Sequence, residues 1–147
     1  MLSVAEAQAK VIDGLKPLAS EQVPLGSARG RVLSADVAAQ RTQPPFDVSA
    51  MDGYAVRAQD VATLPASLKN VGTVAAGALF QGSVGKSEAV RIFTGAPVPK
   101  GATTIVIQEN TQVEGDTVRV VDGAAPAGRH IRRAGLDFKK GDKPLKA

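Results

Sequence analysis

The sequence of 147 residues has no cysteine, no tryptophan and a single histidine, and aromatic side chains make up only 3% of it. The absence of cysteine excludes disulfides and thiolate metal sites. The one histidine, His130, stands in a basic run and gives no support for a Ser-His-Asp system, since a lone histidine is more often structural or solvated. No apolar run reaches about 18 residues, and none has signal-peptide character. We therefore expect a soluble cytoplasmic protein with no membrane partner.

The net charge of +4 is unevenly distributed along the chain. Residues 129–147 hold seven basic and two acidic side chains, whereas the other 128 residues hold 11 basic and 12 acidic ones. A basic segment can bind nucleic acid, phosphate or another oxyanion, or it can form a solvated face. Because the chain has few aromatic side chains to stack on single-stranded bases, we expect no nucleic-acid partner.

An amphipathic helix is predicted near the N-terminus, over residues 3–15. Ser3 and Glu6 have the spacing of a capping box, apolar residues follow at helical intervals, and a glycine and a proline supply the stop. A short second helix is expected over 27–33, followed by an extended segment over 36–40. Helices this short do not build a core alone, so we expect them to pack on the rest of the protein or on a partner.

Beyond residue 50 the apolar pattern changes to a period of two, which indicates strands. Glycine and proline separate most of five such runs, which span 54–57, 71–75, 89–94, 104–108 and 117–121. Residues 105–121 form the clearest hairpin, with a turn at Glu114-Gly115-Asp116, where glycine accepts a positive φ. The sequence has neither the strand–helix alternation of a Rossmann unit nor a phosphate-loop glycine pattern.

Together these elements predict a mixed α+β fold that is mainly β. We expect the N-terminal helical part of an incomplete linker domain over 1–46 and a small antiparallel β domain or barrel over 47–133. Residues 134–147 would begin a truncated return to the first domain. The last segment ends without a helix or strand pattern, so we expect the chain to be a fragment of a longer protein.

The stretch Pro44–Val56 is the first candidate site. Two prolines fix an extended start, and Asp47, Ser49 and Asp52 lie between them and a strand. Such a group could hold a cation or a polar ligand, because Mg²⁺ accepts one or two protein carboxylates plus water. The alternative is a well-made turn, which the residue types alone favour. The carboxylates open to a hard cation are Asp47, Asp52, Glu109 and Asp137.

A second informative stretch spans Arg91–Ala102. A predicted strand runs into Thr94-Gly95-Ala96, and two prolines then stiffen the loop. Thr94 would present its hydroxyl and nearby backbone N–H groups at a strand end, which is a suitable place to hold an oxyanion. The alternative is a stiff connection between two strands, and this stretch does not decide the question by itself.

Three runs occur together in the order and spacing of one family. They are Pro45–Ala55, Arg91–Pro97 and Ile131–Asp137, which read PFDVSAMDGYA, RIFTGAP and IRRAGLD. The run SAMDGYA is long and has little simple structural reason to recur. On these runs the chain resembles the N-terminal part of the molybdopterin molybdenumtransferase (MoeA) family, which is also similar to the E domain of gephyrin. The resemblance extends over nearly all of the chain.

The resemblance implies insertion of molybdenum from molybdate into adenylated molybdopterin, with release of AMP and help from Mg²⁺. It also implies a homodimer in which the β domain of one chain faces the pterin-binding domain of the other. The matching positions are Asp52 and Thr94 as catalytic residues, Ser49, Arg132 and Arg133 as substrate-binding residues, and Asp52 and Asp137 as metal ligands. In these roles Asp52 would hold the cation or position water. The hydroxyls would donate to oxyanion oxygens, and the arginines would attract the anionic substrate.

Three positions depart from the family pattern. Val48 stands where Asn is usual, Thr103 where Asp is frequent, and Leu136 where Glu is common. The first change removes a local hydrogen bond, and the last removes an acid beside Asp137. The resemblance further implies that the pterin-binding domain lies beyond residue 147, so we expect the chain alone to be inactive. The rival interpretation is a non-catalytic scaffold or interaction module of the same fold.

Overall fold

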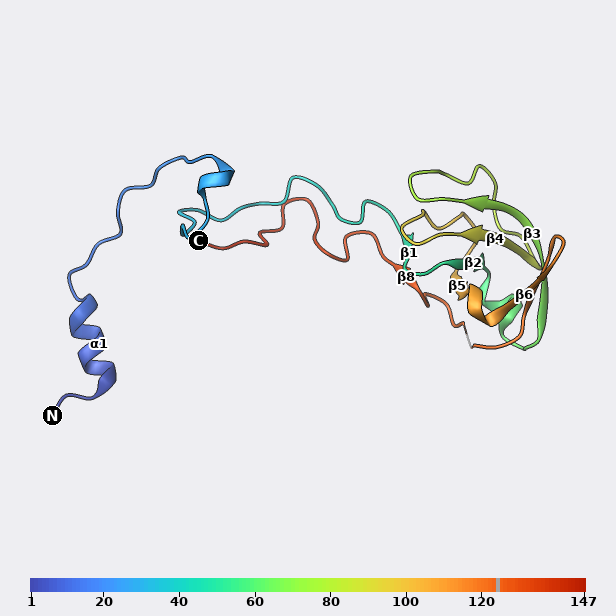
Figure 1. Cartoon of the computed structure of the whole chain (residues 1–147), viewed down its shortest axis with the longest axis horizontal. Coiled ribbons are helices and arrows are strands. Elements are labelled where there is room, and N and C mark those ends of the chain that lie inside the picture. The colour runs from blue at the N-terminus through green and yellow to red at the C-terminus, as the bar shows by residue number, and fades with distance from the viewer. Residues whose placement is uncertain (124) are drawn as a thin grey trace. The chain divides into compact units, whose positions relative to one another are not determined.

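Residues 38–144 fold around a curled six-stranded sheet, whereas residues 1–37 and 145–147 form a separate unit (Figure 1). The computed structural model of the chain describes residues 1–123 and 125–147. The two units divide the chain at points other than the predicted domain boundaries. Those boundaries, 46/47 and 133/134, stay a prediction about the arrangement in the family.

The N-terminal unit contains the predicted helix, α1, over Val4–Ile12. The capping box is confirmed, because Ser3 Oγ accepts from the Glu6 N–H at 3.3 Å while Glu6 Oε2 accepts from the Ser3 N–H at 2.7 Å. The helix ends earlier than predicted, with Asp13 extended and Gly14 at φ +79°. Every residue of α1 is exposed, so its apolar side is not covered within this unit.

The predicted second helix is wrong. The structure has only the single 3₁₀ turn η1, Leu25–Ser27, and residues 28–33 are not helical. Gly30 lies at φ +79°, a conformation that interrupts a right-handed helix. Further on, Val37 lies in an isolated antiparallel bridge with Leu145, as the predicted extended segment requires.

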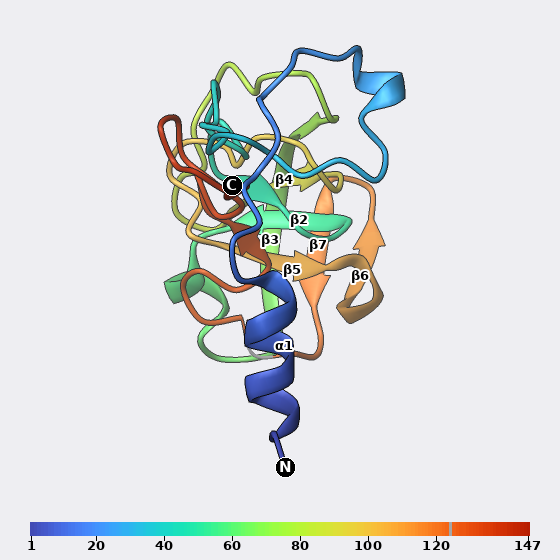
Figure 2. The same ribbon diagram turned by 90° about the vertical axis from the view of Figure 1, so that its left-hand side faces the viewer.

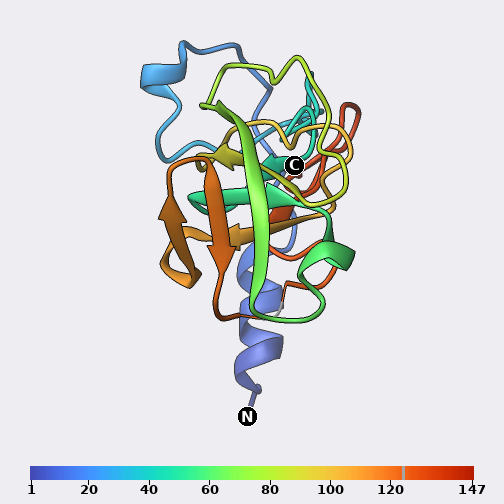
Figure 3. The ribbon, with the colours of Figure 1, turned by 90° about the vertical axis from the view of Figure 1, so that its right-hand side faces the viewer.

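The sheet in residues 38–144 has the strand order β5-β2-β4-β3-β7-β6. Its strands are β2 (Gly53–Val56), β3 (Ala66–Val74), β4 (Glu88–Ile92), β5 (Thr104–Ile107), β6 (Thr111–Glu114) and β7 (Thr117–Val120). Two 3₁₀ turns, η2 (Ala58–Val61) and η3 (Gln108–Asn110), follow β2 and β5. Figure 2 shows β2 between β4 and β5, and Figure 3 shows β7 between β3 and β6. The mainly β, mixed α+β fold is therefore confirmed.

Two details of the sheet differ from the sequence-based expectation. The strand from Thr104 pairs with β2, whereas the hairpin partner of β7 is the separate strand β6. The predicted turn itself is correct, since Glu114 pairs with Thr117 and Gly115 has φ +57°. In addition, β3 and β4 pair in parallel within an otherwise antiparallel sheet. Alternating apolar residues indicate a strand but carry no information about its direction.

The alternation of apolar side chains supplies a core cluster on each face of the sheet. One cluster contains Tyr54, Val56, Val61, Leu68, Ala89, Val106, Val118, Val120 and Ala125. The other contains Ala55, Val74, Val84, Val90, Ile92, Ala96 and Ile105. Small aliphatic residues thus fill the core, as the scarcity of aromatics predicts. Each fully buried valine or isoleucine stabilises the fold by about 1.5–3 kcal/mol relative to exposure.

Two distant segments, 38–49 and 131–144, run antiparallel beside each other (Figure 1). At one end the N–H of Ala39 donates to the carbonyl of Asp142 at 2.7 Å, and the N–H of Gln43 donates to the carbonyl of Phe138 at 2.8 Å. At the other end, next to the six-stranded sheet, the segments form a two-residue ladder between β1 (Val48–Ser49) and β8 (Ile131–Arg132). None of the helices in the described residues has the length and apolar character that a membrane span requires.

Candidate functional site

Asp52 lies at the end of the sheet where β2 begins. The register pairs Gly53 with Ile92 of β4 and with Ile107 of β5. One residue further along, Asp52 is level with Phe93 and Gln108, and the Gln108 N–H donates to the Asp52 carbonyl at 3.1 Å. Because side chains alternate along a strand, residues two apart share a face, so Asp52 lies on the face that carries Tyr54.

Asp52 and Thr94 are joined directly, although they are 42 residues apart. The backbone N–H and the Oγ1 hydroxyl of Thr94 both donate to Oδ1 of Asp52, at 2.7 Å and 2.8 Å. These two hydrogen bonds, the backbone one first, lower the pKa of Asp52, and the nearby positive charge of Arg91 adds to the effect. The exposed carboxylate is therefore ionised at neutral pH. Its Oδ2 atom accepts no hydrogen bond from the described residues and is available to a cation or a water molecule.

Ser49 occupies a different kind of position. Its side chain is buried, and its Oγ donates to the Met51 carbonyl at 2.6 Å. Its backbone N–H donates to the Ala96 carbonyl and its carbonyl accepts from the Gly95 N–H, both at 2.9 Å. In this structure the hydroxyl fixes the turn that leads to Asp52. Its predicted contact with substrate stays a prediction.

The two arginines predicted to bind substrate, Arg132 and Arg133, each form an ion pair with a carboxylate. Arg132 Nη2 lies 2.6 Å from Asp137 Oδ1, so a predicted substrate-binding residue neutralises a predicted metal ligand. Arg133 Nη1 lies 2.6 Å from Asp47 Oδ2, whose other oxygen accepts from the Ala134 N–H at 2.9 Å. All four side chains are at least 36% exposed, and exposed pairs of this kind typically contribute only about 0–1 kcal/mol. Neither ion pair therefore holds its arginine strongly.

The Asp47 contact makes a prediction about pH. The Ala134 N–H is the main cause that lowers the pKa of Asp47, and Arg133 also contributes. Because the folded-state pKa is depressed, the contact stabilises the fold above the unfolded pKa of about 3.9 and is lost as pH falls through the folded value. We expect the Ala134 amide resonance to titrate with a midpoint below about 3.9. Asp47→Asn should abolish this titration in an NMR series, whereas a midpoint at or above that value would contradict the contact.

Two residues beside this pair, Arg91 and Gln108, are not among the predicted site residues. Arg91 Nη1 donates to the Gly53 carbonyl at 3.2 Å, and Nη2 donates to Oε1 of Gln108. The guanidinium carbon lies 5.2 Å from the centroid of the Tyr54 ring and 4.9 Å from that of Phe93. In the sequence Arg91 is one polar position in an apolar strand, and only the strand register reveals its neighbours.

The donor set around Asp52 suits a magnesium ion more than a transition metal. Among residues 1–123 and 125–147, no group of three or more His, Cys, Asp or Glu side chains could hold a metal ion. Mg²⁺ is commonly bound by one or two carboxylates, with water and substrate phosphates as the remaining ligands. The single ionised carboxylate of Asp52 fits that pattern, whereas Asp137 would have to leave Arg132 to take part.

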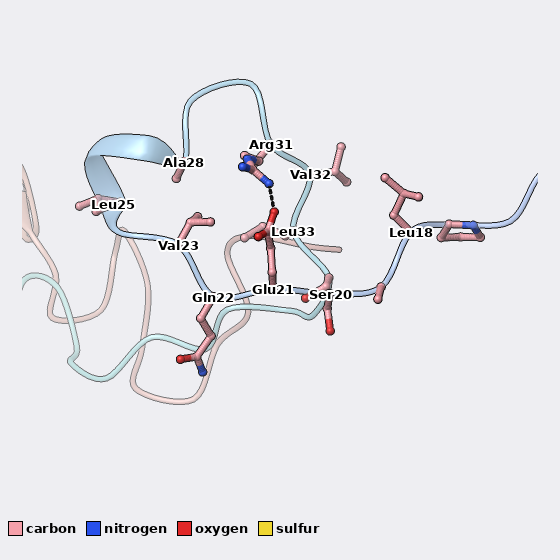
Figure 4. A pocket seen from close by; sticks show the side chains of 13 residues that line it. Leu18, Ser20, Glu21, Gln22, Val23, Leu25, Ala28, Arg31, Val32 and Leu33 are labelled. Atoms are coloured by element: carbon pink, nitrogen blue, oxygen red, sulfur yellow. Dashed lines mark hydrogen bonds and ion pairs between the residues drawn. The ribbon is translucent and has the colours of Figure 1, made fainter.

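A groove in the N-terminal unit is lined by residues between positions 17 and 34 (Figure 4). Apolar side chains such as Leu18, Val23 and Val32 line it, and Arg31 and Glu21 form an ion pair within it. None of the predicted site residues is part of its lining.

Comparison with known proteins identifies the family. The protein-family model described as the MoeA N-terminal region (domain I and II) matches residues 2–147 of this sequence. Molybdopterin molybdenumtransferase 2 of Mycobacterium tuberculosis is 43% identical over 145 residues, and the Haemophilus influenzae molybdopterin molybdenumtransferase is 36% identical over 143 residues. The alignments cover 96% and 97% of this chain but 36% and 35% of those proteins, so the chain spans about a third of their length.

A solved structure leads to the same family. The crystal structure of the molybdopterin biosynthesis MoeA protein from Pyrococcus horikoshii has a TM-score of 0.77 and 39% identity to this chain. The match covers 86% of this chain and 34% of that one. Both the resemblance in sequence and the fold are thereby confirmed. The chain belongs to the family of MoeA N-terminal regions.

Proposed function

We propose that this chain contributes one part of a site that inserts molybdenum from molybdate into adenylated molybdopterin and releases AMP. A role in molybdenum cofactor biosynthesis is supported by the family and by the printed names of the relatives. The observation that carries the proposal is the Asp52–Thr94 pair, an ionised carboxylate fixed between the start of β2 and the end of β4. A preorganised charge of this kind is what phosphoryl and oxyanion chemistry requires.

In this proposal Asp52 would hold Mg²⁺, and Thr94 would keep the carboxylate in one orientation. When bound, the ion would neutralise negative charge on substrate oxygens. Thr94 Oγ1 already donates to Asp52, so its first role is to orient the carboxylate. Asp137 is a second ligand only after it separates from Arg132.

Arg132 and Arg133 bind the anionic substrate by exchanging their carboxylate partners for phosphate or molybdate oxygens. A guanidinium group forms bidentate hydrogen bonds with tetrahedral oxyanions. The exchange costs little free energy because both ion pairs are exposed to solvent. Ser49 acts in the same site by fixing the turn before Asp52, and its buried hydroxyl reaches substrate only if that turn opens.

The proposal includes the partners that the resemblance implies. Adenylated molybdopterin and molybdate are the substrates, a homodimer brings the β domain of one chain to the pterin-binding domain of the other, and the reaction takes place in the cytoplasm. Nucleic acid and membranes have no part in it. The chain corresponds to about a third of its relatives' length, so the test requires the remaining domains.

The direct test is a chimaera in which this chain replaces the matching region of the full-length Haemophilus influenzae relative. With adenylated molybdopterin, Mg²⁺ and molybdate, we expect AMP release and molybdenum bound to the pterin, measured by chromatography and by metal analysis. Omission of molybdate or chelation of Mg²⁺ should suppress AMP release. A folded dimeric chimaera with no turnover would overturn the proposal and favour the non-catalytic scaffold.

A further inference from the structure

The environment of Arg91 is unusual for a chain so poor in aromatic residues. The sequence has one tyrosine, four phenylalanines and no tryptophan, and two of these five rings lie against one guanidinium group. Its carbon atom is 5.2 Å from the Tyr54 centroid and 4.9 Å from the Phe93 centroid. Both distances lie within the range of a cation–π interaction, which is worth about 0.5–2 kcal/mol depending on desolvation.

The strand register explains why the rings meet this arginine. Tyr54 is directly opposite Arg91 in the antiparallel β2–β4 pair, and Phe93 follows two residues after Arg91 on the same face. Tyr54 is buried, with 6% exposure, whereas Phe93 is 37% exposed. The guanidinium therefore lies at the rim of the core cluster on this face, between a buried ring and an accessible one.

The hydrogen bonds of Arg91 lead directly to the candidate site. Nη1 donates to the carbonyl of Gly53, the residue that follows Asp52, and Nη2 donates to Oε1 of Gln108. The N–H of Gln108 in turn donates to the Asp52 carbonyl at 3.1 Å. One side chain of β4 thus connects the start of β2 to the residue that follows β5, and Asp52 is hydrogen-bonded or adjacent to both.

We propose that Arg91 is a positioning residue that fixes the backbone on which the Asp52–Thr94 pair is built. Its contacts with two rings and two oxygen acceptors keep it in place, so it acts through Asp52 and Thr94 and does not bind substrate itself. Lysine can replace it only in part, because an ammonium group keeps the positive charge but has neither the planar surface that stacks on rings nor the two-pronged donor geometry. The functional meaning of this role rests on the proposed molybdenum-insertion site.

The first arm of the test uses the 147-residue chain and amide hydrogen exchange. In Arg91→Met we expect the Thr94 amide to exchange about tenfold faster, because the carboxylate that accepts its hydrogen bond is no longer held in place. Arg91→Lys should give an intermediate increase. Arg119→Met, at an exposed position of β7 in the same sheet, is the matched control and should leave the exchange rate of the Thr94 amide unchanged. The amide of buried Val118 reports global opening and should respond to none of these variants.

The second arm measures activity in the chimaera. Arg91→Met should lower kcat for AMP release about tenfold with little change in KM for molybdate, since a misplaced reactive group affects the chemical step. Arg91→Lys should recover part of the loss. Equal acceleration of Thr94 and Val118 exchange would make Arg91 a general fold-stabilising residue and overturn the inference. Normal turnover in Arg91→Met together with an inactive Asp52→Asn variant would also overturn the inference about Arg91. Normal turnover in both variants would instead reject the proposed site.

Discussion

Asp52→Asn should lower the rate of molybdenum insertion by the chimaera on the order of 100-fold or more. Asparagine keeps an oxygen in the Oδ1 position, so the hydrogen bonds from the Thr94 N–H and hydroxyl, 2.7 Å and 2.8 Å in the structure, can persist. What the variant loses is the negative charge available to a cation at Oδ2. A loss of activity would therefore result from the missing negative charge and not from a disrupted turn. AMP release under saturating molybdate is the measurement.

The control for this prediction is Asp116→Asn, which removes a carboxylate from the exposed turn between β6 and β7 and should leave the rate unchanged. A magnesium titration separates two roles. If Asp52 holds the ion, raised Mg²⁺ should restore part of the activity of Asp52→Asn; if the carboxylate acts on water directly, it should not. An Asp52→Asn variant with wild-type turnover at ordinary Mg²⁺ would remove Asp52 from the catalytic machinery.

Gly53→Ala should destabilise the sheet by about 3 kcal/mol. A Cβ atom at this position would lie 2.0 Å from the carbonyl oxygen of Val106 and 2.9 Å from its carbonyl carbon. These are backbone atoms of the neighbouring strand β5, so relief requires β2 and β5 to separate. Urea unfolding followed by the fluorescence of Tyr54, the only tyrosine and the next residue in the chain, measures the loss.

Gly72→Ala is the matched control, because it adds the same methyl group to β3 of the same sheet. There the Cβ would lie 2.6 Å from Cε2 of Phe80, an atom of a half-buried side chain that can turn aside. We expect a cost below about 1 kcal/mol. Equal losses in the two variants would show that crowding by backbone is not what makes Gly53 necessary.

The sequence predicted strands well where apolar residues alternate and both faces are buried. The predictions over 54–57, 89–94 and 104–108 differ from β2, β4 and β5 by at most two residues at either end. The strand near Val71 begins five residues earlier than predicted, at Ala66. Its first half holds Ser67, Lys69 and Asn70 with only Leu68 fully buried, so the apolar pattern there is too weak to indicate a strand.

Two predictions are wrong for separate physical reasons. Gln112 and Glu114 make β6 polar, as suits an edge strand, so the apolar pattern predicts one longer hairpin over 105–121 in place of a separate strand. The helix predicted after Ser27 fails because Gly30 takes a positive φ. Pairing partners and strand direction depend on contacts between segments far apart in the chain, and the period of a pattern does not contain them.

The sequence predicts only part of the candidate site, namely Asp52 and Thr94. Residue chemistry marks Asp52 and Thr94 as separate candidates and the family resemblance gives them a joint role, but no local rule connects two residues 42 positions apart. Arg91 and Gln108 were not singled out because an arginine and a glutamine beside strand residues are ordinary. Once the register of β2, β4 and β5 is known, Arg91 and Gln108 fall on the same face of the sheet as Asp52. Gln108 is level with Asp52, and Arg91 is two residue positions further along the strands.

The ladder between β1 and β8 has a further consequence. Ser49 pairs with Ile131, so the chain leaves for the six-stranded sheet and comes back from it at one point, with residues 50–130 between. Segments whose ends meet in this way tolerate excision and transplantation, because a short turn can close the gap without disturbing the flanking backbone. Residues 50–130 could therefore be exchanged as a unit, in evolution or by protein engineering. The paired segments that carry Asp47 and Arg133 would stay in place and accept a different inserted segment.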